Sequence, residues 1–303
     1  TMVAAVLPFA ALGEIAGHRR VCLVGLVVFT LASAACGFAW SLSSLVVFRG
    51  LQGLGGAAMM AVNGAMIRFI APPERLGAAL GTNAMVVGSC FVIGPTVTSI
   101  VLAIAPWPWL FLFKLPICVL ALYVGWKSLP DTALAAHKFD GLASVLCALL
   151  FGTFVLGLGE AAHAAPWPRV TIELTIAVVC LVWLLRRQAG HPAPMLAIDL
   201  FRRPLFALSS LTGICAFATQ GFAFVALPFL FQHRLGRSVV EIGLLITPWP
   251  VVVAVLAPIA GRLSDRYPAG LLGGIGLAVL ASGMMLMATM PPVPSDFDII
   301  WRM

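Results

Sequence analysis

The stretch that decides the fold is Ser44–Met66, which reads SLVVFRGLQGLGGAAMMAVNGAM. It contains one charged residue, Arg49, in a run long enough to cross a bilayer as a helix, for which about 20 residues suffice. The small residues Gly53, Gly56 and Ala57 recur at helical spacing and share one face, where a second helix can approach closely. An arginine near this face of small residues indicates that the helix has a packing or functional role and does not merely face lipid.

The rest of the 303-residue chain has the same apolar character. Hydrophobic residues make up 61% of it and charged residues 10%, whereas soluble domains carry about a quarter charged residues. The sequence therefore predicts an all-α membrane protein, a polytopic helical bundle of about ten transmembrane helices. The expected segments are 1–13, 20–38, 44–66, 76–103, 109–127, 141–159, 169–186, 204–230, 238–261 and 269–290.

The cations between these segments alternate strongly from one side to the other. Twelve lie in one set of loops and only Arg169, Arg234 and Arg237 in the opposite set, which predicts that the first set is cytoplasmic. The twelve are Arg19, Arg20, Arg68, Arg75, Lys127, Lys138, Arg186, Arg187, Arg202, Arg203, Arg262 and Arg266. They stand singly and in pairs and form no basic stripe, so no nucleic-acid partner is expected.

Two cations fall inside expected spans, Arg49 and Lys114. A charge in a span is costly and indicates either a functional site or a side chain that reaches the nearby interface. For Lys114 the second interpretation is favoured. For Arg49 the surrounding residues favour function, because Gln52 lies one helical turn away and Asn63 lies deeper in the same helix.

The spacing of Leu45, Arg49, Gln52, Gly53 and Gly55 resembles the fourth-span motif of the major facilitator superfamily. By resemblance, the chain is expected to have that superfamily's fold and to work as a secondary transporter by alternating access. The same resemblance assigns Arg49 and Gln52 to proton coupling.

The next segment carries a second motif with the spacing of the superfamily's antiporter motif on the fifth span. Its members are Gly81, Cys90, Gly94, Pro95 and Thr98, with Cys90 and Thr98 replacing usual glycines. A Gly-Pro pair removes a backbone hydrogen bond and permits both a bend and close helix contact. An ordinary proline kink is the alternative interpretation.

A loop pattern resembling the superfamily's loop motif occurs twice, at 10–20 and at 261–268. Each copy has a small residue, a leucine and an acid at alternate positions, followed by basic residues. Duplication of this kind is typical of two parallel halves of a transporter. The residues predicted to form a cytoplasmic gate are Glu14, Gly17, Arg19, Arg20, Gly261, Asp265 and Arg266. Alternatively, both loops are only positive-inside anchors.

The resemblance also implies a domain organisation. Residues 1–128 are expected to form an N-terminal half bundle, 129–190 an inserted pair of transmembrane helices, and 191–303 the start of a C-terminal half bundle. The inserted pair resembles the fourteen-span drug:proton antiporter family 2, and so does a preceding motif made of Trp107, Trp109, Phe111, Pro116 and Ile117. Within that motif Lys114 stands where the branch commonly has an asparagine, and Pro108 replaces a usual arginine. By this alignment the chain is a fragment that lacks the first span and the last spans.

The expected function is proton-coupled efflux of small amphiphilic or drug-like molecules across the bacterial cytoplasmic (inner) membrane. A membrane carboxylate usually carries the proton, yet none of the eleven acidic residues lies in the middle of an expected span. The carboxylate paired with Arg49 is therefore expected outside this chain, which alone should not transport. A metabolite exporter and a non-transporting receptor or scaffold stay open as alternatives.

Polar and aromatic residues within spans are the candidates for the substrate cavity: Asn63, Thr219, Gln220 and Trp249. Trp249 stands between two prolines, which predict a distorted helix, and its indole either holds a cation or simply packs. No enzyme motif occurs, and cysteine and histidine spacing predicts no metal site. The expected partners are the lipid bilayer, a small-molecule substrate and protons. We expect a monomer without a cofactor, driven by the proton gradient.

Overall fold

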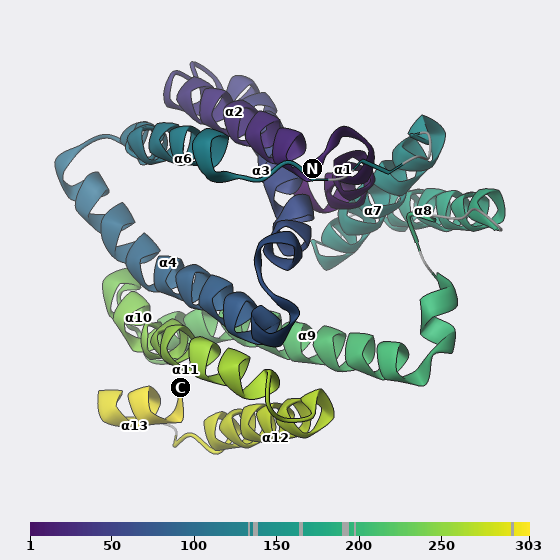
Figure 1. The fold of residues 1–303 in the computed structure, drawn as a ribbon. Coiled ribbons are helices and arrows are strands. Elements are labelled where there is room, and N and C mark those ends of the chain that lie inside the picture. The colour runs from purple at the N-terminus through teal and green to yellow at the C-terminus, as the bar shows by residue number, and fades with distance from the viewer. Residues whose placement is uncertain (133, 136–138, 164–165, 190–193, 197, 292–293) are drawn as a thin grey trace. The chain divides into compact units, whose positions relative to one another are not determined.

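The computed structural model of the protein describes residues 1–132, 134–135, 139–163, 166–189, 194–196, 198–291 and 294–303 (Figure 1). Within these residues the secondary structure is helical and contains no strand. Nine described helical segments are long and apolar enough to cross a membrane, and α1 is a shorter apolar helix. The expected all-α membrane bundle is thus confirmed. Lys138, one of the twelve expected cytoplasmic cations, lies outside the described residues.

The helices begin and end close to the expected boundaries. They are α1 (Met2–Ala16), α2 (His18–Gly37), α3 (Leu42–Ile70), α4 (Leu76–Ile104), α5 (Trp109–Leu112), α6 (Leu115–Ser128), α7 (Gly141–Ala162), α8 (Trp167–Gln188), α9 (Pro204–His233), α10 (Val239–Ile246), α11 (Pro248–Ser264), α12 (Ala269–Ala288) and α13 (Asp296–Arg302). Two short 3-10 turns, η1 (Pro73–Arg75) and η2 (Ile198–Arg202), precede α4 and α9. The distortion predicted around Trp249 is confirmed, because the helix is interrupted at Thr247 between α10 and α11.

The chain packs as two compact units. One comprises Thr1–Ile70 and Val101–Ala197, and the other comprises Ala71–Ile100 and Ile198–Met303. These units describe packing only, so the division into two half bundles and an inserted pair stays a prediction.

In the first unit, α2 lies along α3, and α1 contacts both of them and also α7. α7 and α8 form an antiparallel hairpin whose interface buries Leu146, Cys147, Cys180 and Leu184. Asp140 caps the start of α7, because its Oδ1 accepts a hydrogen bond from the Ala143 amide at 3.0 Å. Because α1 contacts α7, the α7–α8 pair is attached to the rest of its unit through α1.

The backbones of α2 and α3 approach each other closely at two glycines, Gly25 and Gly55. A Cβ added to Gly55 would lie 2.5 Å from the Phe29 nitrogen and 2.6 Å from the Gly25 carbonyl oxygen. The predicted seam of Gly53 and Gly56 instead faces the start of α1, where a Cβ on Gly56 would lie 3.8 Å from Met2 Cε. The helix therefore uses two small-residue faces, and sequence analysis found one of them.

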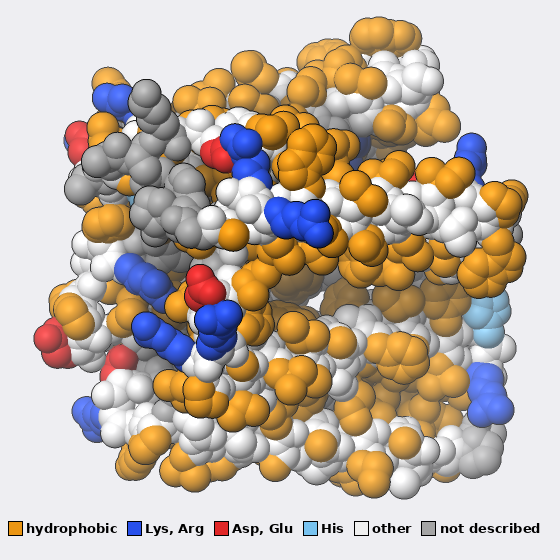
Figure 2. All heavy atoms as spheres, turned by 90° about the vertical axis from the view of Figure 1, so that its right-hand side faces the viewer, with side chains coloured by type: hydrophobic (Ala, Val, Ile, Leu, Met, Phe, Trp, Pro, Cys, Tyr) orange, Lys and Arg blue, Asp and Glu red, His pale blue; other side chains and the backbone are white. Residues whose placement is uncertain are grey.

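Large apolar side chains cover much of the molecular surface. Trp40 is 81% exposed and Ile104 is 82% exposed, and many other leucines, valines and phenylalanines are exposed along the helices. Figure 2 shows one face on which hydrophobic side chains dominate, while lysines and arginines appear singly or in small groups. Such a surface is stable against lipid and not against water, as expected for a polytopic membrane protein.

Candidate functional site

A chain of three hydrogen bonds runs from Arg49 into the interface between α3 and α2. Arg49 Nη1 donates to Gln52 Oε1 at 2.7 Å, and Gln52 Nε2 donates to Ser33 Oγ at 2.6 Å. Ser33 Oγ in turn donates to the Phe29 carbonyl oxygen at 2.6 Å. Gln52 is 3% exposed and Ser33 is 0% exposed, so each needs these partners to offset its lost hydration.

The network connects two residues predicted together with one that sequence analysis missed. Arg49 and Gln52 are three residues apart in α3, which places them on one face of the helix. Ser33 lies on a different helix, and its only sequence signal is a hydroxyl group within an apolar span. The buried end of the network holds the Gln52 amide in one orientation, and that amide positions the guanidinium.

Aromatic rings hold two cations near each other in the same unit. The guanidinium carbon of Arg49 lies 5.8 Å from the centroid of the Phe111 ring, and Lys114 Nζ lies 5.1 Å from the same centroid. Lys114 Nζ also lies 5.2 Å from the centroid of Phe29. These contacts, which were not predicted, direct the lysine ammonium toward α2 and α5. The first unit thus gathers two positive charges around Phe111.

A cavity of about 750 Å³ opens beside Arg49. Arg49, Gln52 and Phe29 line one part of its wall, Phe151 and Leu156 of α7 line another, and Thr1–Ala4, the first residues of the sequence, line a third. Its volume lies within the range of roughly 300–1,000 Å³ that is typical of small-molecule sites. Arg49, a predicted proton-coupling residue, therefore lines a hollow that also borders the first residues of the sequence.

The first copy of the loop motif is connected to the loop that follows α6. Gly17 has φ +94°, a conformation that favours glycine, and it turns the chain sharply between α1 and α2. Arg19 Nη1 pairs with Asp131 Oδ1 at 3.1 Å, and the His18 amide donates to Thr132 Oγ1 at 3.0 Å. The Ala135 amide donates to the carbonyl oxygen of Glu14 at 2.8 Å, while Arg20 is exposed.

The second copy is connected to the start of α4 within the other unit. Asp265 Oδ1 accepts from the Gly77 amide at 2.7 Å, and Asp265 Oδ2 accepts from the Ala78 amide at 2.9 Å. A carboxylate placed there satisfies two unpaired amides and complements the positive end of the helix dipole. Arg266 is exposed. Gly77 and Ala78 were not among the predicted site residues.

Close packing of α4 on α11 makes the Asp265 contact possible. A Cβ on Gly81 would lie 2.6 Å from the Ala257 carbonyl oxygen and 2.9 Å from Gly261 Cα. A Cβ on Gly261 would lie 2.8 Å from Gly81 Cα. The predicted residues Gly81 and Gly261 thus meet, and they bring the Asp265 carboxylate to the first turn of α4.

The remaining predicted residues of the antiporter motif lie further along α4, where Cys90 and Gly94 are exposed and Pro95 lies within the helix. Among the cavity candidates, Asn63 is exposed on α3 and Thr219 donates to the Cys215 carbonyl oxygen in α9. Gln220 is half-buried next to Thr219. The centroids of the Trp249 and Phe224 rings lie 5.9 Å apart, which supports the interpretation that this indole packs against a neighbouring ring.

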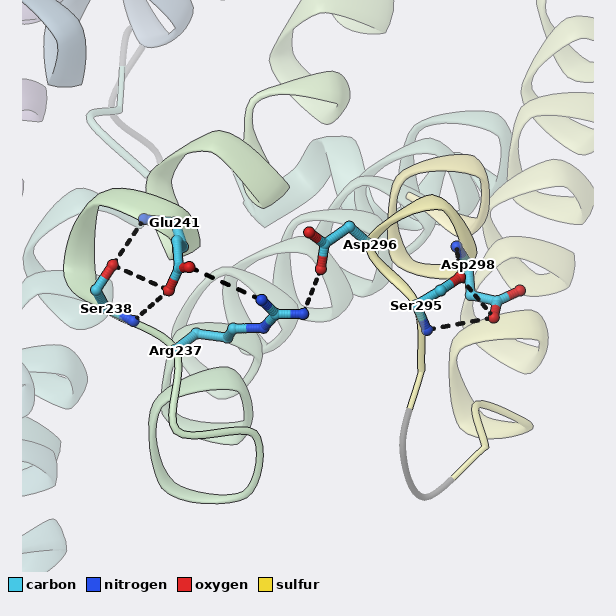
Figure 3. Close-up of polar contacts among 6 residues, drawn as sticks. All are labelled: Arg237, Ser238, Glu241, Ser295, Asp296 and Asp298. Carbon is cyan, nitrogen blue, oxygen red and sulfur yellow. Dashed lines mark hydrogen bonds and ion pairs between the residues drawn. The ribbon is translucent and has the colours of Figure 1, made fainter.

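Polar contacts also connect α10 and α13 in the second unit (Figure 3). Ser238 and Glu241 form a capping box at the start of α10, and Ser295 and Asp298 form another at the start of α13. Arg237 forms ion pairs with both Glu241 and Asp296 and so connects the two capped ends. Arg237 lies in a loop expected outside the cytoplasm, whereas Ser238 and Glu241 fall within the expected span 238–261. Sequence analysis selected none of these residues for a site.

Comparisons with known proteins agree with this architecture. A profile described as Major Facilitator Superfamily matches residues 1–300. The chain belongs to the major facilitator superfamily. This family membership confirms the resemblance based on the Arg49 motif, and the proteins of this family are transporters.

Individual relatives within the superfamily support the same assignment. The chain is 43% identical over 304 residues to the uncharacterized transporter YebQ of Escherichia coli (strain K12), covering 100% of this chain and 66% of YebQ. It is 31% identical to the tetracenomycin C resistance and export protein of Streptomyces glaucescens, covering 92% and 52% of the two chains. It is 27% identical to the riboflavin transporter RibZ of Clostridioides difficile (strain 630), covering 88% and 58%. The chain thus spans between half and two thirds of these superfamily members.

Proposed function

We propose that this chain is part of a proton-coupled exporter of small amphiphilic or drug-like molecules, which works by alternating access in the bacterial cytoplasmic membrane. The observation that carries the proposal is the hydrogen-bond network that joins Arg49, Gln52 and Ser33 within the apolar interface of α2 and α3. A guanidinium in an apolar wall lowers the pKa of a neighbouring carboxylate, while desolvation raises it. A conformational change that alters this balance makes the carboxylate bind a proton in one state and release it in the other.

Several residues have defined roles in this proposal. Arg49 is the positive partner of a proton-binding carboxylate, and Gln52 positions its guanidinium. Gly81 and Gly261 permit the close contact of α4 and α11, and Asp265 holds the first turn of α4. Breaking the Asp265 contact frees α4 to move, which is how a loop of this kind takes part in a cytoplasmic gate.

Drug export and metabolite export are the two candidates for the substrate class. The tetracenomycin C relative is named as an export protein and supports the first, while the riboflavin relative, named only as a transporter, supports a metabolite as the substrate. Growth assays with deletion and overexpression strains separate them, using a panel of dyes, antibiotics, biocides and vitamins. We expect overexpression to protect against toxic amphiphiles, with the protection lost in Arg49→Ala and kept in Lys127→Gln, an exposed lysine at the end of α6. Protection that persists in Arg49→Ala would remove Arg49 from the coupling mechanism.

A further inference from the structure

An apolar groove of about 460 Å³ runs along α1, α2 and α3, away from the first residues of the sequence. Its lining residues fall in the range 9–58, and all of them belong to the first unit. Gly25 and Gly55 form its floor, since both are buried and the backbones of α2 and α3 meet there. Val24 and Leu51 stand at its rim and are 62% and 45% exposed. Because neither glycine has a side chain, the space between the two rims stays open.

One end of the groove carries a positive charge. Arg20 is the one ionisable residue among those that line the groove, and it is exposed. Among the described residues Arg20 has no ion pair and no side-chain hydrogen bond, whereas the neighbouring Arg19 pairs with Asp131 and donates to the Trp126 carbonyl oxygen. Arg20 also lies in the first turn of α2, at the positive end of the helix dipole. A ligand that complements the groove therefore has a negative group next to an apolar body.

The length of the groove matches one leaflet of a bilayer. Along α2 it extends from Arg20 to Val28, which is about 12 Å at 1.5 Å per residue. Half of a hydrocarbon core about 30 Å thick is about 15 Å. The cation pattern predicts that Arg20 lies on the cytoplasmic side, where an arginine lays its stem along an apolar wall and its guanidinium among the headgroups. Anionic lipids are the negatively charged amphiphiles of that leaflet, and basic sites between helices on this side bind them.

We propose that this groove binds an anionic phospholipid of the cytoplasmic leaflet, with one acyl chain between Val24 and Leu51 and the phosphate paired with Arg20. The lipid contacts three consecutive helices and fills the space that Gly25 and Gly55 leave open. Charge selects the headgroup, because zwitterionic phosphatidylcholine would bring a cation to Arg20 together with its phosphate. The proposed function assigns no role to this groove, so the two proposals are tested separately.

Photolabelling of the full-length protein in phosphatidylcholine nanodiscs tests the site. The probes are phosphatidylglycerol and phosphatidylcholine that carry the same diazirine midway along one acyl chain, and peptide mass spectrometry locates the label. We expect phosphatidylglycerol to label segments 21–28 and 51–58 about fivefold more strongly than phosphatidylcholine does. Labelling of Val179, an exposed residue of α8, should be the same with both lipids. Equal labelling of the groove by both lipids, or none by either because another part of the full-length chain fills it, would overturn the inference.

The charge is tested by changing Arg20. Arg20→Gln should remove the fivefold preference for phosphatidylglycerol at both segments, and Arg20→Lys should retain most of it. Arg186→Gln, at an exposed arginine near the end of α8, is the matched control and should leave the preference unchanged. A preference that survives Arg20→Gln, or that is lost equally in Arg186→Gln, would exclude Arg20 as the partner of the headgroup.

The apolar part of the site is tested with two valines of α2. Val24 lines the groove and Val27 does not, and both are exposed. Val24→Phe fills the groove and should reduce labelling of segment 51–58 several-fold, while Val27→Phe should not. Glycerol 3-phosphate, which has the phosphate without acyl chains, should not compete with the probe. Equal loss of labelling in both variants, or competition by glycerol 3-phosphate, would show that the apolar groove does not hold the lipid.

Discussion

The two copies of the loop motif have similar sequences and make different contacts. In the first copy the basic residue forms the contact, because Arg19 pairs with Asp131 in the loop after α6. In the second copy the acid forms it, because Asp265 accepts two amide hydrogen bonds at the start of α4. Their glycines differ as well, since Gly17 is needed for a positive φ and Gly261 for close helix packing. A repeated pattern therefore predicts where a contact forms better than it predicts which side chain forms it.

Gly261→Leu is the strongest test of this difference. The added side chain would meet the Gly81 backbone and force α4 away from α11, at a cost of about 3 kcal/mol in the free energy of unfolding. Thermal unfolding in detergent measures it as a loss of several degrees in Tm. Gly270→Leu on α12 is the control, because a Cβ there meets nothing within 4 Å. Similar losses in Tm for both variants would show that the close approach of α4 and α11 at Gly261 does not determine the loss of stability.

Asp265→Ala removes the cap of α4 and should have the next largest effect. Loss of two hydrogen bonds to the Gly77 and Ala78 amides should cost about 1–2 kcal/mol. Hydrogen exchange reports it directly, since these two amides should exchange faster in the variant. Asp199→Ala, which changes an exposed acid in η2, is the matched control. Unchanged exchange at Gly77 and Ala78 would exclude Asp265 as their acceptor.

Asp140 both pairs with Arg187 and caps the start of α7. Its titration leads to a pH-dependent prediction. A hydrogen bond from Arg187, followed by one from the Ala143 amide, lowers the pKa of this carboxyl group. Because the folded-state pKa lies below the unfolded value of about 3.9, the stabilisation is complete above that value and is lost as the pH falls through the folded-state pKa. Asp140→Asn keeps a capping side chain but loses the ion pair with Arg187, so it should be about 0.2–1 kcal/mol less stable than the unmodified chain at neutral pH. The difference in unfolding free energy should shrink below about pH 4; a constant difference would contradict it.

Arg19→Gln should have the smallest effect. Asp131 is 81% exposed at its side chain, and exposed ion pairs contribute about 0.2–1 kcal/mol. Raising the salt concentration should reduce the difference further, since the pair is screened. Arg20→Gln, at an exposed neighbour, is the control for loss of charge alone. A destabilisation by Arg19→Gln as large as that of Asp265→Ala would mean that the two copies do not differ as the structure indicates.

Sequence periodicity predicted the parts of the molecule that depend on neighbours along the chain. The positions of the spans follow from apolar runs, and the contact of Arg49 with Gln52 follows from their spacing on one helix. Contacts between helices were harder to predict, because they depend on how each helix rotates about its axis. Ser33, Phe111 and Asp131 carry no local signal for their contacts, and only packing brings them to Gln52, Arg49 and Arg19, respectively.

Lys114 is another residue whose contacts with other helices could not be predicted from the local sequence. Its position near the end of a span predicts a side chain that reaches the interface, and a lysine alone offers no other signal. The structure places its ammonium over Phe29, from a different helix, and over Phe111. The local sequence pattern identifies the lysine charge, but only the tertiary structure shows which aromatic rings contact it.

Substrate-dependent proton movement tests the central claim most directly. The full-length protein is reconstituted into proteoliposomes that contain a pH-sensitive dye, and amphiphilic anions, cations and neutral molecules are added in turn. The account predicts a pH change with at least one amphiphile that is abolished by Arg49→Ala and retained by Lys127→Gln. No pH change with any amphiphile, or an undiminished change in Arg49→Ala, would contradict a proton-coupled exporter built around Arg49.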